Sequence, residues 1–100
     1  ELDLGGNYIR APFPDAIASL TNLRLLNFSQ NKFSSSLPST MSELSTLEVV
    51  DLSSNSLEGT IDGIFVKSNK LQTLNLRGNE FSGTIPTSLI SLPALEYLYL

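Results

Sequence analysis

Apolar and polar residues alternate in five short segments of the chain, and these segments recur every 24 residues. Each segment carries two apolar residues with one other residue between them, a pattern typical of a strand that buries one of its faces. A polar turn follows each of the first four segments. The pattern predicts five short parallel strands side by side in one sheet. The two apolar columns are Leu2, Leu26, Val50, Leu74 and Leu98, and Leu4, Phe28, Leu52, Leu76 and Leu100.

An asparagine stands at the same place after each of the first four segments, with an apolar residue two positions later. The asparagine amide offers two hydrogen-bond donors and two acceptor lone pairs. At a sharp inward turn it can satisfy backbone groups of its own unit and of the adjacent unit, which would be costly to bury unpaired. We therefore expect a structural ladder and not a ligand site. Its members are Asn7, Asn31, Asn55 and Asn79.

The second half of each unit has apolar columns of its own, beginning with Phe13, Leu37, Ile61 and Ile85. Further apolar residues follow at spacings of four, three and three, which favours a short 3₁₀ or α turn on the outer side of a coil. Proline follows the first column at Pro14, Pro38 and Pro86. A fixed short period of this kind predicts an α/β repeat solenoid, and stacked repeats make an extended surface suited to binding.

We expect residues 1–100 to form a single array of four 24-residue units and the strand of a fifth. No capping segment is recognisable at either end, so we expect an interior part of a longer array. Apolar residues left open at both ends would then make the isolated piece only marginally stable.

The units resemble the plant-specific class of leucine-rich repeats, with the pattern LxxLxxLxLxxNxLxGxIPxxLxxL. The best unit is LQTLNLRGNEFSGTIPTSLISL, from Leu71 to Leu92, and a weaker copy runs from Leu47 to Ser68. The resemblance implies a right-handed superhelix with the parallel sheet on its concave face and short 3₁₀ or loop segments on its convex side. It also implies a second strand in each unit, flanking the main sheet. Asp62 replaces the proline and Ser68 a core leucine, so we expect local loosening near residues 62–68 and no loss of the fold.

The composition of the chain argues against several classes of function. The net charge is −4 and the six Lys and Arg residues are scattered, which argues against binding of nucleic acid or of an anionic membrane. No apolar stretch approaches the roughly 18 residues that span a bilayer, so we expect no membrane contact by this segment. Histidine and cysteine are absent, which excludes Cys/His zinc sites, thiol nucleophiles and imidazole acid–base chemistry. We expect neither catalysis nor a cofactor.

Residues between the buried strand leucines are expected to face the concave side. Tyr97 and Tyr99 would place two aromatic side chains on one strand, with Arg77 on the preceding one. Tyrosine and arginine are common anchors of protein interfaces, so these three are our candidate ligand contacts. Leu25 and Val49 could extend the patch. A row of Asp3, Asn27, Asp51 and Asn75 on adjacent strands is expected to form mutual hydrogen bonds and not a ligand site. Its two carboxylates lie two strands apart, which is too far to share a metal.

Asn27-Phe28-Ser29 is the single N-x-S/T sequon. In a secreted protein it could carry a glycan on the concave face, which would keep a partner away from that part of the surface.

The resemblance implies an extracellular recognition ectodomain, like those of plant receptor-like proteins and receptor kinases in defence or development. Its partner would be a protein or peptide ligand, with a co-receptor kinase as a further partner. The full-length protein would then lie on the extracellular side of the plasma membrane, held by a single span. Two alternatives stay open. One is a secreted inhibitor of cell-wall-degrading enzymes, such as a polygalacturonase inhibitor, and the other is an intracellular immune sensor.

Overall fold

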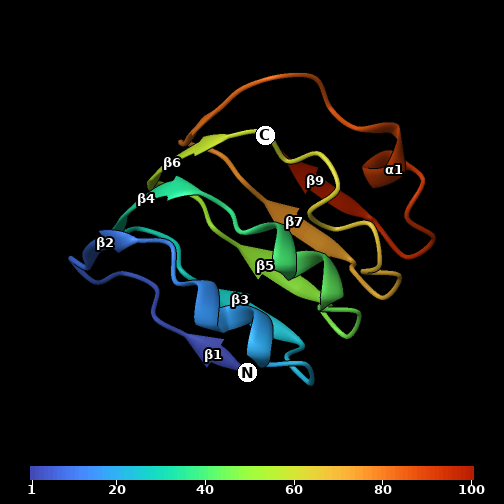
Figure 1. The fold of residues 1–100 in the computed structure, drawn as a ribbon, viewed down its shortest axis with the longest axis horizontal. Coiled ribbons are helices and arrows are strands. Elements are labelled where there is room, and N and C mark those ends of the chain that lie inside the picture. Colours follow the sequence, from blue (N-terminus) through green and yellow to red (C-terminus); the bar gives the residue numbers. More distant parts are fainter.

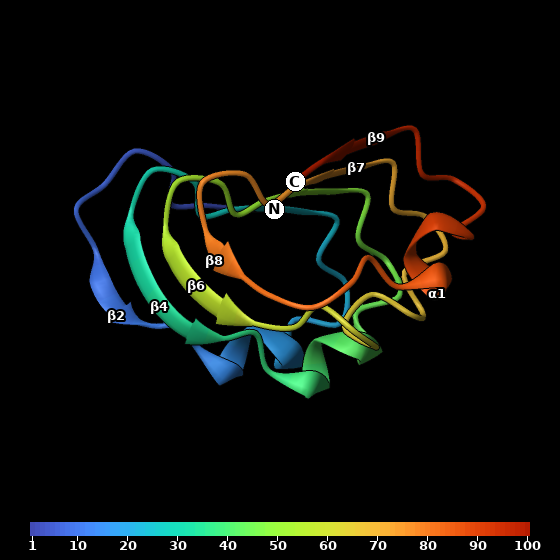
Figure 2. The same cartoon turned by 90° about the horizontal axis from the view of Figure 1, so that it is seen from above.

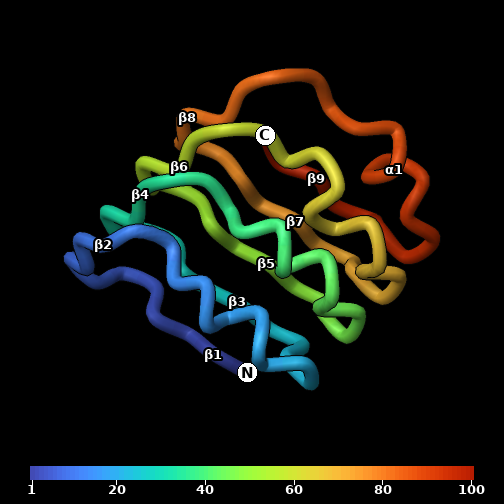
Figure 3. Tube along the Cα trace, viewed as in Figure 1, coloured from blue at the N-terminus to red at the C-terminus, as the bar shows by residue number.

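The computed structural model describes all of residues 1–100 as a stack of coils (Figure 1). One parallel sheet contains one strand from each unit in the order β1-β3-β5-β7-β9. Its strands are β1 (Leu2–Asp3), β3 (Leu25–Asn27), β5 (Val49–Asp51), β7 (Thr73–Asn75) and β9 (Tyr97–Tyr99). The predicted five-stranded parallel sheet is confirmed. Figure 3 shows the chain tracing successive coils, each laid on the one before.

A second parallel sheet follows the first in every coil, in the order β2-β4-β6-β8. Its strands are β2 (Arg10–Pro12), β4 (Lys32–Ser36), β6 (Ser56–Gly59) and β8 (Glu80–Phe81). Figure 2 shows these four strands side by side along one flank of the molecule. The additional strand that the resemblance implied is therefore present in all four units.

The two sheets differ in register. In the inner sheet, paired residues are 24 positions apart, as in Leu26↔Val50. In the second sheet they are 22 positions apart, as in Arg10↔Lys32. Hydrogen bonding between coils therefore shifts the second sheet by two residues relative to the repeat.

Short helices close the coils on the convex side. The 3₁₀ helices η1 (Asp15–Ser19) and η2 (Ser39–Glu43) and the helix α1 (Thr87–Ile90) each begin after one of the predicted prolines, Pro14, Pro38 and Pro86. Proline suits this place because its fixed φ matches the approach to a helix and no amide donor is needed there.

The third unit departs from this scheme, as expected. Where Asp62 replaces proline, residues 62–67 form turns and no helix. Ser68 is nevertheless fully buried, and its hydroxyl donates a hydrogen bond of 3.1 Å to the Leu44 carbonyl. Ile64 and Phe65 are buried as well, so the core is closed around the serine. The loosening is local and the core remains closed.

The core lies between the two sheets and the helical side, and it runs continuously through the stack. Leu26, Val50 and Leu74 of the inner sheet are fully buried. In the first two units three phenylalanine rings pack together, and Phe28 and Phe33 stack with their centroids 4.7 Å apart. Aromatic packing of this kind adds to the stabilisation from burial alone.

Candidate ligand-binding face

The concave face is the outer surface of the inner sheet. In each of β3, β5 and β7 the middle residue is buried and its two neighbours are half-exposed, because successive side chains of a strand point to opposite faces. Two rows of side chains therefore cross the sheet. One row runs Leu25, Val49, Thr73, Tyr97, and the other runs Asp3, Asn27, Asp51, Asn75, Tyr99.

The structure brings Tyr97, Tyr99 and Arg77 together at one end of this face. The two tyrosines end their rows with exposed fractions of 54% and 43%. The Tyr99 carbonyl accepts a 2.8 Å hydrogen bond from the amide of Leu76, the residue before Arg77. Arg77 is exposed, and its own amide is held by the Asn75 side chain at 3.3 Å. Two aromatic rings on β9 and a guanidinium two residues beyond the end of β7 thus lie in adjacent coils, and Arg77 forms no intramolecular ion pair.

Leu25 and Val49 lie directly beside each other on β3 and β5 and are half-buried. Thr73 separates Val49 from Tyr97, so β9 lies two strands, or about 10 Å, from β5. The aliphatic pair therefore does not form one patch with the tyrosines. Thr73 and Asn75 are the concave residues that border the tyrosines, and residue type alone did not single them out.

An ion pair between Arg24 and Glu48 lies beside Leu25 and Val49. Arg24 donates to both carboxylate oxygens of Glu48, at 2.8 and 2.9 Å. These two residues, Leu25, Val49 and Glu1 line a shallow hollow of about 340 Å³ at the edge of the concave face. This pair was not among the residues predicted from the sequence, although opposite charges separated by one repeat length were the available signal.

The pair shifts the titration of both groups. The hydrogen bond from Arg24 lowers the pKa of Glu48 below its ordinary value, partial desolvation opposes this shift, and the charges of Arg24 and Lys70 add to it. The same hydrogen bond and the charge of Glu48 raise the pKa of Arg24. Both groups therefore stay charged through the neutral range.

The expectation of mutual hydrogen bonds along the Asp/Asn row is wrong for most of the row. The single cross-strand link runs from Asn75 to Asp51 at 3.2 Å. Otherwise each side-chain oxygen accepts from the amide two residues further on, as Asp51 does from Ser53 at 2.9 Å. Asp and Asn favour this local bond because their short side chains reach the following turn.

Asn27 follows the same local pattern, and this leaves one side of its amide free. Its Oδ1 accepts from both the amide and the hydroxyl of Ser29, at 3.0 and 2.7 Å. Its Nδ2 donates to no protein group and points toward Gly5, where an added Cβ would lie 2.7 Å away. The atom to which an N-linked glycan attaches therefore lies close against Gly5, where a larger residue would collide with it.

The asparagine ladder has the structural role that was predicted. In Asn55, Nδ2 donates to the carbonyls of Phe28, Leu52 and Ser53, and Oδ1 accepts from the amide of Phe33. Asn31 and Asn79 bond to equivalent groups. Asn7 has no preceding unit in the structure and donates only to Leu4 and Gly5 of its own turn.

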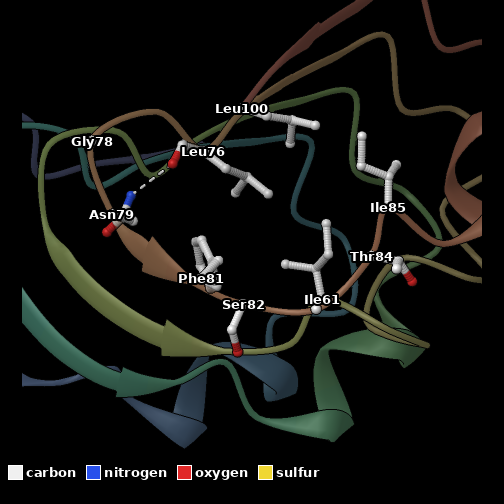
Figure 4. A pocket seen from close by; sticks show the side chains of 10 residues that line it. Ile61, Leu76, Gly78, Asn79, Phe81, Ser82, Thr84, Ile85 and Leu100 are labelled. Atoms are coloured by element: carbon white, nitrogen blue, oxygen red, sulfur yellow. Dashed lines mark hydrogen bonds between the residues drawn. The ribbon is translucent and has the colours of Figure 1, made fainter.

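A cavity of about 250 Å³ lies between the two sheets in the last unit (Figure 4). Leu76, Leu100, Ile61 and Ile85 are among the side chains around it. Ile61 is 7% exposed but Ile85, one repeat later, is 50% exposed, because no coil covers it in this structure. The cavity is therefore the open end of the core, and it contains none of the candidate ligand contacts.

None of the helices is long or apolar enough to cross a bilayer. No group of three or more acidic side chains is arranged to hold a metal ion.

Comparison with known proteins identifies the family. A leucine-rich repeat family model matches residues 1–57 and again residues 45–100. The chain belongs to the leucine-rich repeat family. No curated protein sequence matches it significantly.

Solved structures of plant receptor ectodomains share this leucine-rich repeat fold. The ectodomain of the Arabidopsis thaliana receptor kinase GASSHO1/SCHENGEN3, in complex with CASPARIAN STRIP INTEGRITY FACTOR 2, is 40% identical with a TM-score of 0.91, over 96% of this chain and 12% of that one. The HAESA ectodomain from Arabidopsis, bound to an IDA peptide hormone, is 32% identical with a TM-score of 0.91, over 98% of this chain and 16% of that one.

A third similar structure is the BIR3–SERK2 complex from Arabidopsis thaliana, 34% identical with a TM-score of 0.83, over 96% of this chain and 53% of the other. The leucine-rich repeats described here thus span between an eighth and about half of these three chains. The resemblance to the plant-specific class of repeats is confirmed.

Proposed function

We propose that these repeats are a non-catalytic recognition scaffold in the extracellular ectodomain of a plant receptor-like protein or receptor kinase. The observation that carries the proposal is the group of Tyr97, Tyr99 and Arg77 on the concave face. Its two aromatic rings are large and stiff, and the guanidinium has five donors that no intramolecular carboxylate occupies. The solved ectodomains with the same repeat architecture include one bound to a peptide hormone, which supports a peptide as the ligand class.

The polarity of the group suggests how a peptide would be held. A peptide lying across β7 and β9 would stack apolar or ring side chains on Tyr97 and Tyr99 and present a carboxylate to Arg77. Arginine binds a carboxylate through two parallel hydrogen bonds, so the group would select peptides with an acidic residue or a free C-terminus. Thr73 and Asn75 would supply hydrogen bonds along the same strand.

A pull-down from apoplastic fluid tests this proposal. The immobilised protein is exposed to the peptide fraction, and retained peptides are identified by mass spectrometry. We expect the variant R77A/Y97A/Y99A to lose the peptides that the wild type retains, by at least about tenfold for the tightest binder. The control variant S34A/S36A changes exposed serines on the second sheet and should retain them. Equal retention by the triple variant would rule out this site.

We also propose a glycan at Asn27. The sequon and an Nδ2 that donates to no protein group support it, and a sugar on β3 would confine ligands to the β7–β9 end. Peptide mass mapping of protein from plant cells should find a glycan mass on the peptide containing Asn27, absent in the variant N27Q. An unmodified Asn27 peptide would reject the glycan. If the protein with unmodified Asn27 is located in the plant cytosol, the intracellular alternative is favoured.

A further inference from the structure

Opposite charges are segregated on the outer face of the second sheet. Arg10 on β2 pairs in register with Lys32 on β4. Glu58 on β6 pairs in register with Glu80 on β8. All four residues are exposed. The flank seen in Figure 2 is thus basic along β2 and β4 and acidic along β6 and β8.

This arrangement is unfavourable within one molecule. None of the four residues takes part in an ion pair, and the like charges stand on neighbouring strands about 4.8 Å apart, where they repel. Elsewhere on the surface, charges of neighbouring units are matched. Arg24 pairs with Glu48 at 2.8 Å and Lys67 with Glu43 at 2.7 Å. The second sheet is the part of the surface where paired residues carry the same charge.

The surface between the charged pairs allows close approach. It carries small hydroxyl side chains, including Ser34 and Ser56, which are paired in register, and Ser36. All three are exposed or half-exposed, and the large side chains of these strands, Phe33 and Leu57, point into the core. Short serine side chains can meet another such set through hydrogen bonds without steric conflict.

We propose that this face binds a second copy of the chain about a two-fold axis. The basic end of the face in one copy would lie over the acidic end in the other, so Arg10 and Lys32 of each copy would face Glu58 and Glu80 of its partner. A pattern that is basic at one end and acidic at the other is complementary to itself after such a two-fold rotation. The serines near the axis would meet their own counterparts. Association would place opposite charges beside the two like-charged pairs of each copy and so offset their repulsion.

The size of the face sets the strength of the association. Four strands about 4.8 Å apart, the shortest of two residues and the longest of five, cover on the order of 200 Å², well below the roughly 800 Å² that each partner contributes to a standard interface. The net charge of −4 also makes two copies repel at long range. The dimer is therefore weak and salt-sensitive, and it forms where the local concentration of the protein is high.

Sedimentation equilibrium of the protein in its full natural length tests the proposal. We expect self-association at about 20 mM salt that weakens at least about tenfold at about 300 mM, where the screening length falls to several ångströms. The variants R10E/K32E and E58K/E80K make the face uniformly acidic or uniformly basic. Each should be monomeric alone, and the two should form a heterodimer when mixed.

The quadruple variant R10E/K32E/E58K/E80K inverts the pattern but keeps it complementary to itself, so it should dimerise like the wild type. Circular dichroism verifies that each variant folds, and R10Q/K32Q replaces any reversal that does not. A monomeric wild type at low salt, a double variant that still self-associates, or a monomeric quadruple variant would each overturn the proposal. Peptide retention at Arg77, Tyr97 and Tyr99 should be the same in all variants, so failure here leaves the proposed function unaffected.

Discussion

At the residue scale, one type of side chain links successive coils at the same place in each unit. Each internal asparagine donates to carbonyls in two successive units and accepts an amide from the earlier one. Asn31 is buried, and Asn55 and Asn79 are half-buried. A serine side chain has one hydroxyl donor in place of two amide donors, and an ionised aspartate side chain has no donor. Neither residue could therefore form the same set of bonds.

Replacing Asn55 with alanine should lower the free energy of unfolding by about 2–3 kcal/mol. The loss arises because the amide of Phe33 and the carbonyls around Asn55 lose their partner in a partly buried place. The matched control is N7A, because Asn7 is exposed and donates only within its own turn. Urea denaturation of both variants compares the two losses. A cost for N7A as large as that for N55A would contradict a role in joining units.

A second residue-scale prediction concerns Ser68, which stands in a column of leucines. Restoring the leucine should destabilise the protein by about 1–3 kcal/mol, because Ser68 is already fully buried and a larger side chain would overpack the core around it. S68A should cost about 1 kcal/mol through the lost hydrogen bond to Leu44. Thermal unfolding of both variants checks the order, and a stabilising S68L would show that the third unit has an unfilled space.

At the element scale, coils are joined by side-chain links as well as by the sheets. The segment leading into β5 is tied to the one leading into β3, since the amides of Glu48 and Val49 both donate to the Arg24 carbonyl. The ion pair between the side chains of Arg24 and Glu48 repeats this link on the surface. The backbone hydrogen bonds and the ion pair therefore connect the same two segments, those leading into β3 and β5.

This ion pair should give the stability a pH dependence of known sign. The pKa of Glu48 is lowered in the folded state, so its contribution is fully present above the unfolded-state pKa, about 4.3. It is lost as the pH falls through the lower folded-state value, because protonation then removes the bond in the folded protein. The difference in unfolding free energy between wild type and E48Q should therefore be largest above about pH 5 and shrink toward pH 2.

Urea denaturation at several pH values measures this difference. E96Q is the matched control, because Glu96 is in the same column and forms no ion pair, so it reports the loss of one negative charge alone. If the difference in unfolding free energy between wild type and E48Q grew as the pH fell, the lowered pKa of Glu48 would be contradicted.

At the scale of the whole molecule, the repeats form a one-dimensional chain of couplings. The carbonyl of Leu52 accepts from both Asn55 and Asn79, and the carbonyl of Phe28 accepts from both Asn31 and Asn55. Neighbouring asparagines therefore share an acceptor, whereas Asn31 and Asn79 share none. In such an array each unit is stabilised by its nearest neighbours.

Double-mutant cycles should reveal these shared carbonyls. Either N55A or N79A leaves the Leu52 carbonyl with one donor, and only the double variant leaves it with none. The double loss should therefore exceed the sum of the single losses by about 0.5–2 kcal/mol. N31A combined with N79A should be additive within about 0.5 kcal/mol. Equal coupling in the two pairs would show that stability is spread across the whole array and not passed from neighbour to neighbour.

The sequence by itself determined the coil. The alternation around Val50 fixes which face of a strand is buried, the repeated asparagine fixes the turn, and the proline at position 38 fixes where a helix begins. These features are local, since each follows from the chemistry of a few adjacent residues and recurs with the period. The same reasoning placed Tyr97, Tyr99 and Arg77 on the concave side, because the pleat assigns a face to each position in a strand.

The tertiary structure alone decided which side chains become neighbours across coils. Thr73 separates Val49 from Tyr97, and Asp51 bonds to its own Ser53 in preference to Asn27. In the second sheet, a period of 24 would pair Arg10 with a serine, but a register of 22 pairs it with Lys32 and creates the segregated charges. Lateral register depends on how backbone hydrogen bonds align whole coils, and no single repeat contains that information.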